Sequence, residues 1–107
     1  MIKIFSYDES NVNTLFREVG RPMKNILGAQ MRAARALLRW AAADLVRESG
    51  VSLATIHRAE SVDGVSAMTL ANASAIRRAV ENAGIELIEE DGGGPGARLK
   101  RPLSDQS

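Results

Sequence analysis

Two short apolar patterns with helical spacing, joined by a tight turn, stand out between residues 42 and 60 of the chain. Apolar side chains three to four residues apart lie on one face of a helix, so the spacing predicts two helices, 42–49 and 53–60. We expect these helices to pack at a steep angle on a third helix. The apolar positions that support this packing are Leu45, Val46, Val51, Ile56 and Ala59.

The turn between the two helices carries local stop and start signals. The turn is Gly50-Val51-Ser52, and Ser52 directly precedes the second helix. The hydroxyl oxygen of Ser52 can accept a hydrogen bond from a free backbone N–H of the first turn, as an N-cap residue does. Two short helices joined in this way are typical of a helix-turn-helix, whose second helix enters the DNA major groove.

Helical spacing also predicts a first helix over 24–39 and a fourth over 66–82. We expect Ser66 to cap the fourth helix, which is either one helix or two shorter ones. Beyond it the period changes to two, which predicts a strand over 85–90 and a returning strand over 97–100. The predicted fold is mostly α, with four to five helices and a C-terminal β-hairpin.

The predicted organisation has one domain. Residues 23–84 form the helical, DNA-binding part, residues 85–101 the hairpin, and residues 102–107 a frayed tail. Residues 1–22 are either a flexible leader, with Met23 as an alternative start, or they supply an edge strand to the hairpin from Ile2–Phe5. Resistance of this extension to proteolysis distinguishes the two alternatives.

Composition excludes several classes of protein. The chain has 107 residues, no cysteine and one histidine, which leaves no disulfide, no thiolate metal site and no multi-histidine zinc site. No apolar run is long enough to span a bilayer and no signal peptide is evident, so we expect a cytoplasmic protein without a cofactor. Residues 21–60 carry a net charge of +4 and residues 61–96 a net charge of −4. The basic segment is the one that would meet phosphates.

Two segments resemble a known family of small bacterial regulators. They are GAQMRAARALLRWAAADLVRESGVSLATIHRAES (Gly28–Ser61) and IRRAVENAGIELIEEDGGGPGARLKRP (Ile76–Pro102). Both are similar to the Cro and lambda-repressor type of helix-turn-helix protein, often called the XRE family. The resemblance covers about three quarters of the chain. It implies a lambda-repressor-like bundle and a structural salt bridge between Arg35 and Glu60.

The chain departs from the family pattern where the second helix begins. The family has a serine or threonine cap there, followed by a glutamine that holds a DNA phosphate, whereas this chain has Ala41 and Ala42. We expect either weaker DNA binding per monomer or a greater reliance on dimerisation, with Arg39 supplying some of the missing backbone contact. A loss of strong DNA binding is a third alternative. Trp40, just before these alanines, is expected in the core.

The second helix of the motif carries the candidate base contacts. The guanidinium of Arg58 can bind guanine through two hydrogen bonds, and His57 can reach a base or a phosphate. Leu53 and Ala54 can touch a thymine methyl group, and Thr55 adds a hydroxyl near the backbone. The full set of predicted DNA contacts is Arg39, Ser52, Leu53, Ala54, Thr55, His57 and Arg58. Arg32 is a further candidate for a phosphate.

The hairpin has more apolar groups than a two-stranded ribbon can bury by itself. They are Ile85, Leu87, Ile88 and Leu99. The helical bundle, residues 2–5 or the hairpin of a second subunit could cover them. We expect the second subunit, because a two-fold dimer would place two recognition helices about one DNA turn apart.

These observations predict a sequence-specific DNA-binding regulator, a dimeric repressor, whose partners are double-stranded DNA and a second copy of the chain. The alternative is an antitoxin or an interaction adaptor that uses the hairpin edge to bind another protein. No nucleophile and base stand in a catalytic arrangement, so an enzyme is not expected. The glycine loop at 92–96 lacks the lysine of a phosphate-binding loop and is interpreted as a hairpin turn.

Overall fold

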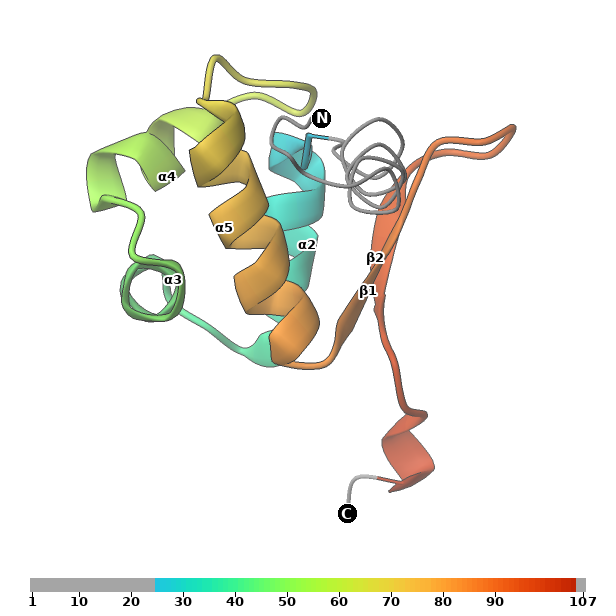
Figure 1. The fold of residues 1–107 in the computed structure, drawn as a ribbon. Coiled ribbons are helices and arrows are strands. Elements are labelled where there is room, and N and C mark those ends of the chain that lie inside the picture. Colours follow the sequence, from blue (N-terminus) through green and yellow to red (C-terminus); the bar gives the residue numbers. More distant parts are fainter. Residues whose placement is uncertain (1–24, 106–107) are drawn as a thin grey trace, which may run out of the picture.

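The computed structural model describes residues 25–105. In that range four α-helices precede a two-stranded antiparallel hairpin and a short 3-10 helix (Figure 1). The elements are α2 (Gly28–Leu38), α3 (Ala42–Ser49), α4 (Leu53–Glu60), α5 (Leu70–Asn82), β1 (Ile85–Ile88), β2 (Gly96–Leu99) and η2 (Leu103–Asp105). The predicted mostly α fold with a C-terminal hairpin is confirmed. The predicted extension over residues 1–22 lies outside the described residues, and η2 replaces part of the predicted frayed tail.

The two helices α3 and α4 have the bounds that the sequence predicts. Gly50 ends α3 in the left-handed conformation, with φ +77°. Ser52 caps α4 by accepting a hydrogen bond from the Thr55 N–H at 3.2 Å. Both signals are local, which is why the sequence alone was sufficient to place these ends.

Helices α2 and α5 are shorter than the sequence predicts. Helix α2 begins at Gly28 because Leu27 is extended, and it ends at Leu38 because Arg39 is left-handed, with φ +59°. Helix α5 is a single helix capped by Thr69, whose hydroxyl accepts from the Asn72 N–H at 3.0 Å, and not by Ser66. It ends at Asn82, as predicted.

The elements form layers around one core. Helices α3 and α4 lie on one side, the hairpin lies on the other, and α2 and α5 pass between them (Figure 1). Trp40 and Leu38 pack against this core from its edge. The fully buried side chains with the largest volumes are Ile26, Met31, Leu45, Ile56, Ile76, Ile85, Gln30 and Val80.

The hairpin is fixed to α2 by the side chain of one buried residue, Gln30. Its amide nitrogen donates to the carbonyl oxygens of Ile88, at 2.9 Å, and Gly96, at 3.1 Å, which face each other across the two strands. Its amide oxygen accepts from the Leu27 N–H at 3.0 Å. A buried amide stabilises a fold only when its polar atoms are paired, and here both are. Gln30 therefore sets the position of the hairpin on the bundle.

Within residues 25–105, none of the helices has the length and apolar character needed to cross a bilayer.

Candidate nucleic-acid interface

Helix α4 has a buried face and an exposed face. Ile56, Ala59 and Glu60 are buried against the bundle. Leu53, Ala54, His57 and Arg58 are exposed, and Thr55 is half-buried. The exposed side chains are those that the sequence predicts as base contacts. The packing of α4 therefore leaves all of these side chains accessible to a ligand.

A line of polar side chains runs along the exposed face at intervals of three residues. The Ser52 hydroxyl donates to the Thr55 hydroxyl at 3.0 Å, and the Arg58 guanidinium donates to the same Thr55 oxygen at 3.4 Å. Residues three apart are neighbours on a helix surface. The chain of bonds holds the guanidinium along α4 while most of its donors remain available to a ligand.

The back of α4 is held to α2 by an ion pair. The Arg35 guanidinium donates to both carboxylate oxygens of Glu60, at 2.7 and 2.8 Å, and to the Trp40 carbonyl oxygen at 2.9 Å. Hydrogen bonding to the Glu60 carboxylate raises the pKa of Arg35 above its ordinary value. The salt bridge that the resemblance implies is thus present, and it fixes the angle of α4 on the bundle. Charged pairs with two parallel bonds hold geometry well.

Arg32 is used inside the molecule. Its guanidinium forms an ion pair with Asp63 and donates to the carbonyl oxygens of Glu60 and Val62, the latter at 3.1 Å. These bonds tie the loop after α4 to α2. Three of its five donors are thus used within the protein, which makes Arg32 a weaker candidate for a phosphate contact than Arg39.

The same loop requires a glycine at the start of α2. A Cβ atom on Gly28 would lie 1.9 Å from the Val62 carbonyl oxygen and 2.5 Å from that of Ala59. The backbone N–H groups of Gly28 and Ala29 donate to the carbonyl oxygens of Gly64 and Asp63, both at 3.0 Å. This contact positions the end of α4, and sequence reasoning missed it because the two segments are about thirty residues apart.

The start of α3 is capped by an unexpected residue. The Ala41 side chain makes no cap, as the sequence predicts, but the Asp44 carboxylate accepts from the Ala41 N–H at 2.8 Å. This bond lowers the pKa of Asp44, and the hydrogen bond from Arg47 lowers it by a smaller amount. Asp44 also places a negative charge near the helix N-terminus, partly balanced by Arg47 at 3.0 Å. A DNA phosphate at this position is therefore less favoured than in the family pattern.

Arg39 is an exposed cation in a strained position. The Arg39 N–H donates to the Ala36 carbonyl and the Trp40 N–H to the Arg35 carbonyl, which together close α2 in a Schellman motif. Glycine is the usual residue at this left-handed position because a Cβ atom is disfavoured there. Among the described residues Arg39 forms no ion pair. Its charge is therefore available to a ligand at the junction of α2 and α3.

Three of the four predicted dimerisation residues, Ile85, Leu87 and Leu99, face their own bundle. Ile85 and Leu87 belong to the buried core, with Leu87 only 8% exposed. Leu99 packs against that core, and Ile88 is half-buried. For these three residues the bundle, one of the three coverings that the sequence leaves open, is the one found, whereas Ile88 lies on the opposite face of the strand. The expectation that Ile85 and Leu87 join two subunits is corrected, because a side chain inside the core cannot also contact a partner.

The exposed face of α4 thus presents hydrogen-bonding and methyl groups, and Arg39 adds an exposed cation at the junction of α2 and α3. No protein-family model matches the chain, and the curated proteins include no significant match.

Proposed function

We propose that the chain is a sequence-specific DNA-binding regulator, acting as a repressor, that reads the major groove with α4. The observation that carries the proposal is the division of α4 into a buried face and an accessible face. Arg58, His57, Ala54 and Leu53 on the accessible face include both hydrogen-bond donors and methyl groups, the two kinds of group that distinguish base pairs in the major groove.

Three features support a lambda-repressor-like arrangement. A three-residue turn joins α3 to α4, the two helices contact each other, and the Arg35–Glu60 pair fixes α4 on α2. In this proposal the exposed face of α4, including Arg58, meets base edges, and Arg39 meets the phosphate backbone beside α3. The base contacts supply sequence preference, while the phosphate contact supplies affinity and orientation.

A homodimer remains part of the proposal, since one eight-residue helix can read only a few base pairs. The contact between subunits would involve outward-facing groups, because Ile85 and Leu87 are buried within one chain. Sedimentation of the protein with and without a two-half-site duplex would give the number of chains per site.

Replacement of Arg58, the proposed base contact, tests whether α4 recognises DNA sequence. Replacing Arg58 with alanine should weaken binding to a cognate duplex by about 1–3 kcal/mol and reduce discrimination against a scrambled duplex. The matched control is Arg98→Ala, which removes an exposed arginine from the hairpin on the other side of the molecule (Figure 1). An Arg58→Ala protein with unchanged selectivity and affinity would refute the role of α4 in recognition.

A further inference from the structure

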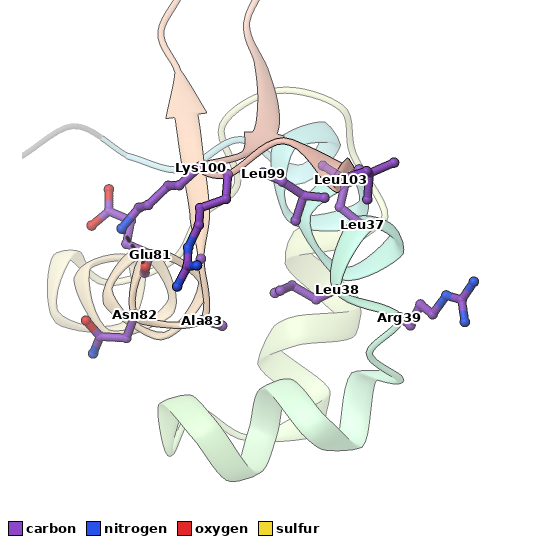
Figure 2. Close-up of a pocket in the computed structure, with 11 residues that line it drawn as sticks. Leu37, Leu38, Arg39, Glu81, Asn82, Ala83, Leu99, Lys100 and Leu103 are labelled. Carbon is purple, nitrogen blue, oxygen red and sulfur yellow. Dashed lines mark hydrogen bonds between the residues drawn. The ribbon is translucent and has the colours of Figure 1, made fainter. Parts of the chain in front are cut away.

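A groove opens where the C-terminal ends of α2 and α5 meet the chain that follows β2 (Figure 2). Its volume is about 1000 Å³. The residues that line it belong to α2, α5, β2, η2 and the turns beside them, and none belongs to α3 or α4. The groove therefore lies apart from the exposed face of α4, and it shares one residue, Arg39, with the proposed DNA-binding surface.

Leucine side chains form the apolar part of the groove. Leu38 and Leu99 pack against the core from its floor. Leu37 is 40% exposed and Leu103 is 75% exposed, although both are large apolar side chains. Leu37, Leu99 and Leu103 gather on one side of the groove in Figure 2. Exposed apolar groups collected in a concave surface with a polar rim are typical of binding sites.

The rim of the groove is mostly cationic. Lys100 stands on one side and Arg39 on the other, where its side chain points away from the leucines (Figure 2). The Lys100 ammonium donates one hydrogen bond, to the Glu81 carbonyl oxygen at 2.8 Å, and an ammonium has three donors. Glu81 is the only acidic residue of the lining, and its carboxylate lies 3.6 Å from the Arg77 guanidinium. The lining thus combines an apolar floor with a net positive charge, from Lys100, Arg101 and Arg39 against Glu81.

This chemistry selects among possible occupants. A second copy related by a two-fold axis would bring the cationic rim against itself, and like charges in an interface cost several kcal/mol. A nucleic-acid backbone would match the cations but leave the leucines uncovered. An amphipathic helix with acidic residues beside its apolar stripe would satisfy both. A helical turn is about 5.4 Å long and about 10 Å wide, so the volume corresponds to about two turns.

We propose that this groove binds a short acidic amphipathic helix of a partner protein, with leucine-like side chains on the floor and carboxylates against the rim. Helix-in-groove recognition uses apolar anchors at i, i+3, i+4 and i+7. The groove would let the protein hold a partner while the face of α4 is occupied. This inference does not depend on what α4 binds.

The probe is a synthetic fluorescent peptide with leucines at those four spacings and glutamates beside them, titrated with the full chain and followed by anisotropy. A matched peptide has lysine in place of every glutamate. We expect the glutamate peptide to bind about tenfold more tightly than the lysine peptide. Equal affinity of the two peptides would overturn the proposal.

Two variants locate the binding. Leu103→Asp and Lys100→Glu should each weaken the glutamate peptide by about tenfold, because one removes an anchor and the other reverses a charge. Arg58→Ala and Arg98→Ala are matched controls and should leave its affinity unchanged. The melting temperature verifies that each variant is folded, and the 75% exposure of Leu103 makes a folding defect there unexpected.

Three results would contradict the proposal. If Arg58→Ala weakens the peptide as much as Leu103→Asp does, the peptide binds the face of α4 instead. If Lys100→Glu weakens DNA binding and leaves the affinity for the peptide unchanged, the rim of the groove binds DNA phosphates instead. If Leu103→Asp converts a dimer to a monomer in sedimentation, the groove is an interface between two copies.

Discussion

Helix α4 and the β1–β2 hairpin both pack against α2, but they approach it from different sides and are held by different forces (Figure 1). Besides the burial of Ile56 and Ala59, polar contacts and one close backbone approach hold the back of α4, namely the Arg35–Glu60 pair, the bonds of Arg32 and the contact at Gly28. Apolar burial of Ile85 and Leu87 holds the hairpin, together with the amide of Gln30.

This difference explains which surface side chains are available for binding. The exposed residues of α4 do not contribute to the core, so we expect their replacement to change stability little. Ile85 and Leu87 of the hairpin are part of the core, so they stabilise one chain rather than join two. Amphipathic spacing alone does not distinguish these cases, because it identifies an apolar face without identifying what covers it.

The largest expected effect concerns the backbone contact behind α4. Gly28→Ala should lower the free energy of unfolding by roughly 4 kcal/mol, because its Cβ atom would meet two carbonyl oxygens that belong to backbone. Urea denaturation followed by circular dichroism measures the change. Gly64→Ala is the matched control, since nothing lies within 4 Å of a Cβ atom there. Equal stability of the two variants would mean that α2 and the loop after α4 do not approach closely.

The second prediction concerns the hairpin. Ile85→Ala should lower the free energy of unfolding by roughly 3 kcal/mol, because Ile85 is fully buried and its truncation leaves a cavity. The unfolding midpoint of Ile85→Ala should depend on protein concentration no more than the midpoint of the wild type does. If Ile85 instead joined two subunits, the loss of stability would vary with concentration. Leu103→Ala, at an exposed leucine, should leave stability nearly unchanged.

A smaller effect, of opposite sign, is expected at the junction of α2 and α3. Arg39→Gly should raise the free energy of unfolding by roughly 1 kcal/mol, because glycine adopts the left-handed conformation without strain. It should also weaken DNA binding and reduce the slope of log affinity against log salt concentration by about 1, the value for one phosphate contact. Arg39→Ala separates the two effects, since it removes the charge and keeps the Cβ atom. A loss of affinity in the glycine variant alone would exclude a charge effect.

The smallest expected effect is the acid dependence of α3. The pKa of Asp44 is lowered by its bonds to Ala41 and Arg47, so its carboxylate stabilises the folded state above the unfolded pKa of about 3.9. That contribution is lost as the pH falls through the lower, folded-state pKa. The melting temperature of the wild type should therefore exceed that of Asp44→Asn at neutral pH. The difference between the two melting temperatures should shrink as the pH falls below about 3.9. A constant difference across this range would show that charge is not its cause.

The parts of the fold predicted from the sequence are those specified by local signals. Gly50 and Ser52 determine the ends of α3 and α4 through bonds within a few residues, and the alternation after Gly84 identifies the hairpin. The cap of α5 was misplaced because Ser66 and Thr69 both have a suitable hydroxyl. Which of them caps depends on where Ala73 and Ile76 enter the core, and that is a tertiary property.

The parts that could not be predicted depend on contacts between distant segments. The carbonyl partners of Gln30 are 58 and 66 residues away in the sequence, and the oxygen that requires Gly28 lies in the loop after α4. The candidate DNA contacts of α4 were accessible as predicted, because helical spacing fixes which side of a short helix is apolar. Asp44 as the cap of α3 could have been found, since an acid three residues after an N-cap position is a capping signal.

The most direct test of the central claim is binding of the purified full chain to the DNA upstream of its own gene, against a scrambled duplex of equal length, at two salt concentrations. We predict selective binding whose affinity falls as salt rises, because phosphate contacts release counterions. Weak binding without preference for the upstream duplex at either salt concentration would contradict the assignment of α4 as a reader of DNA sequence.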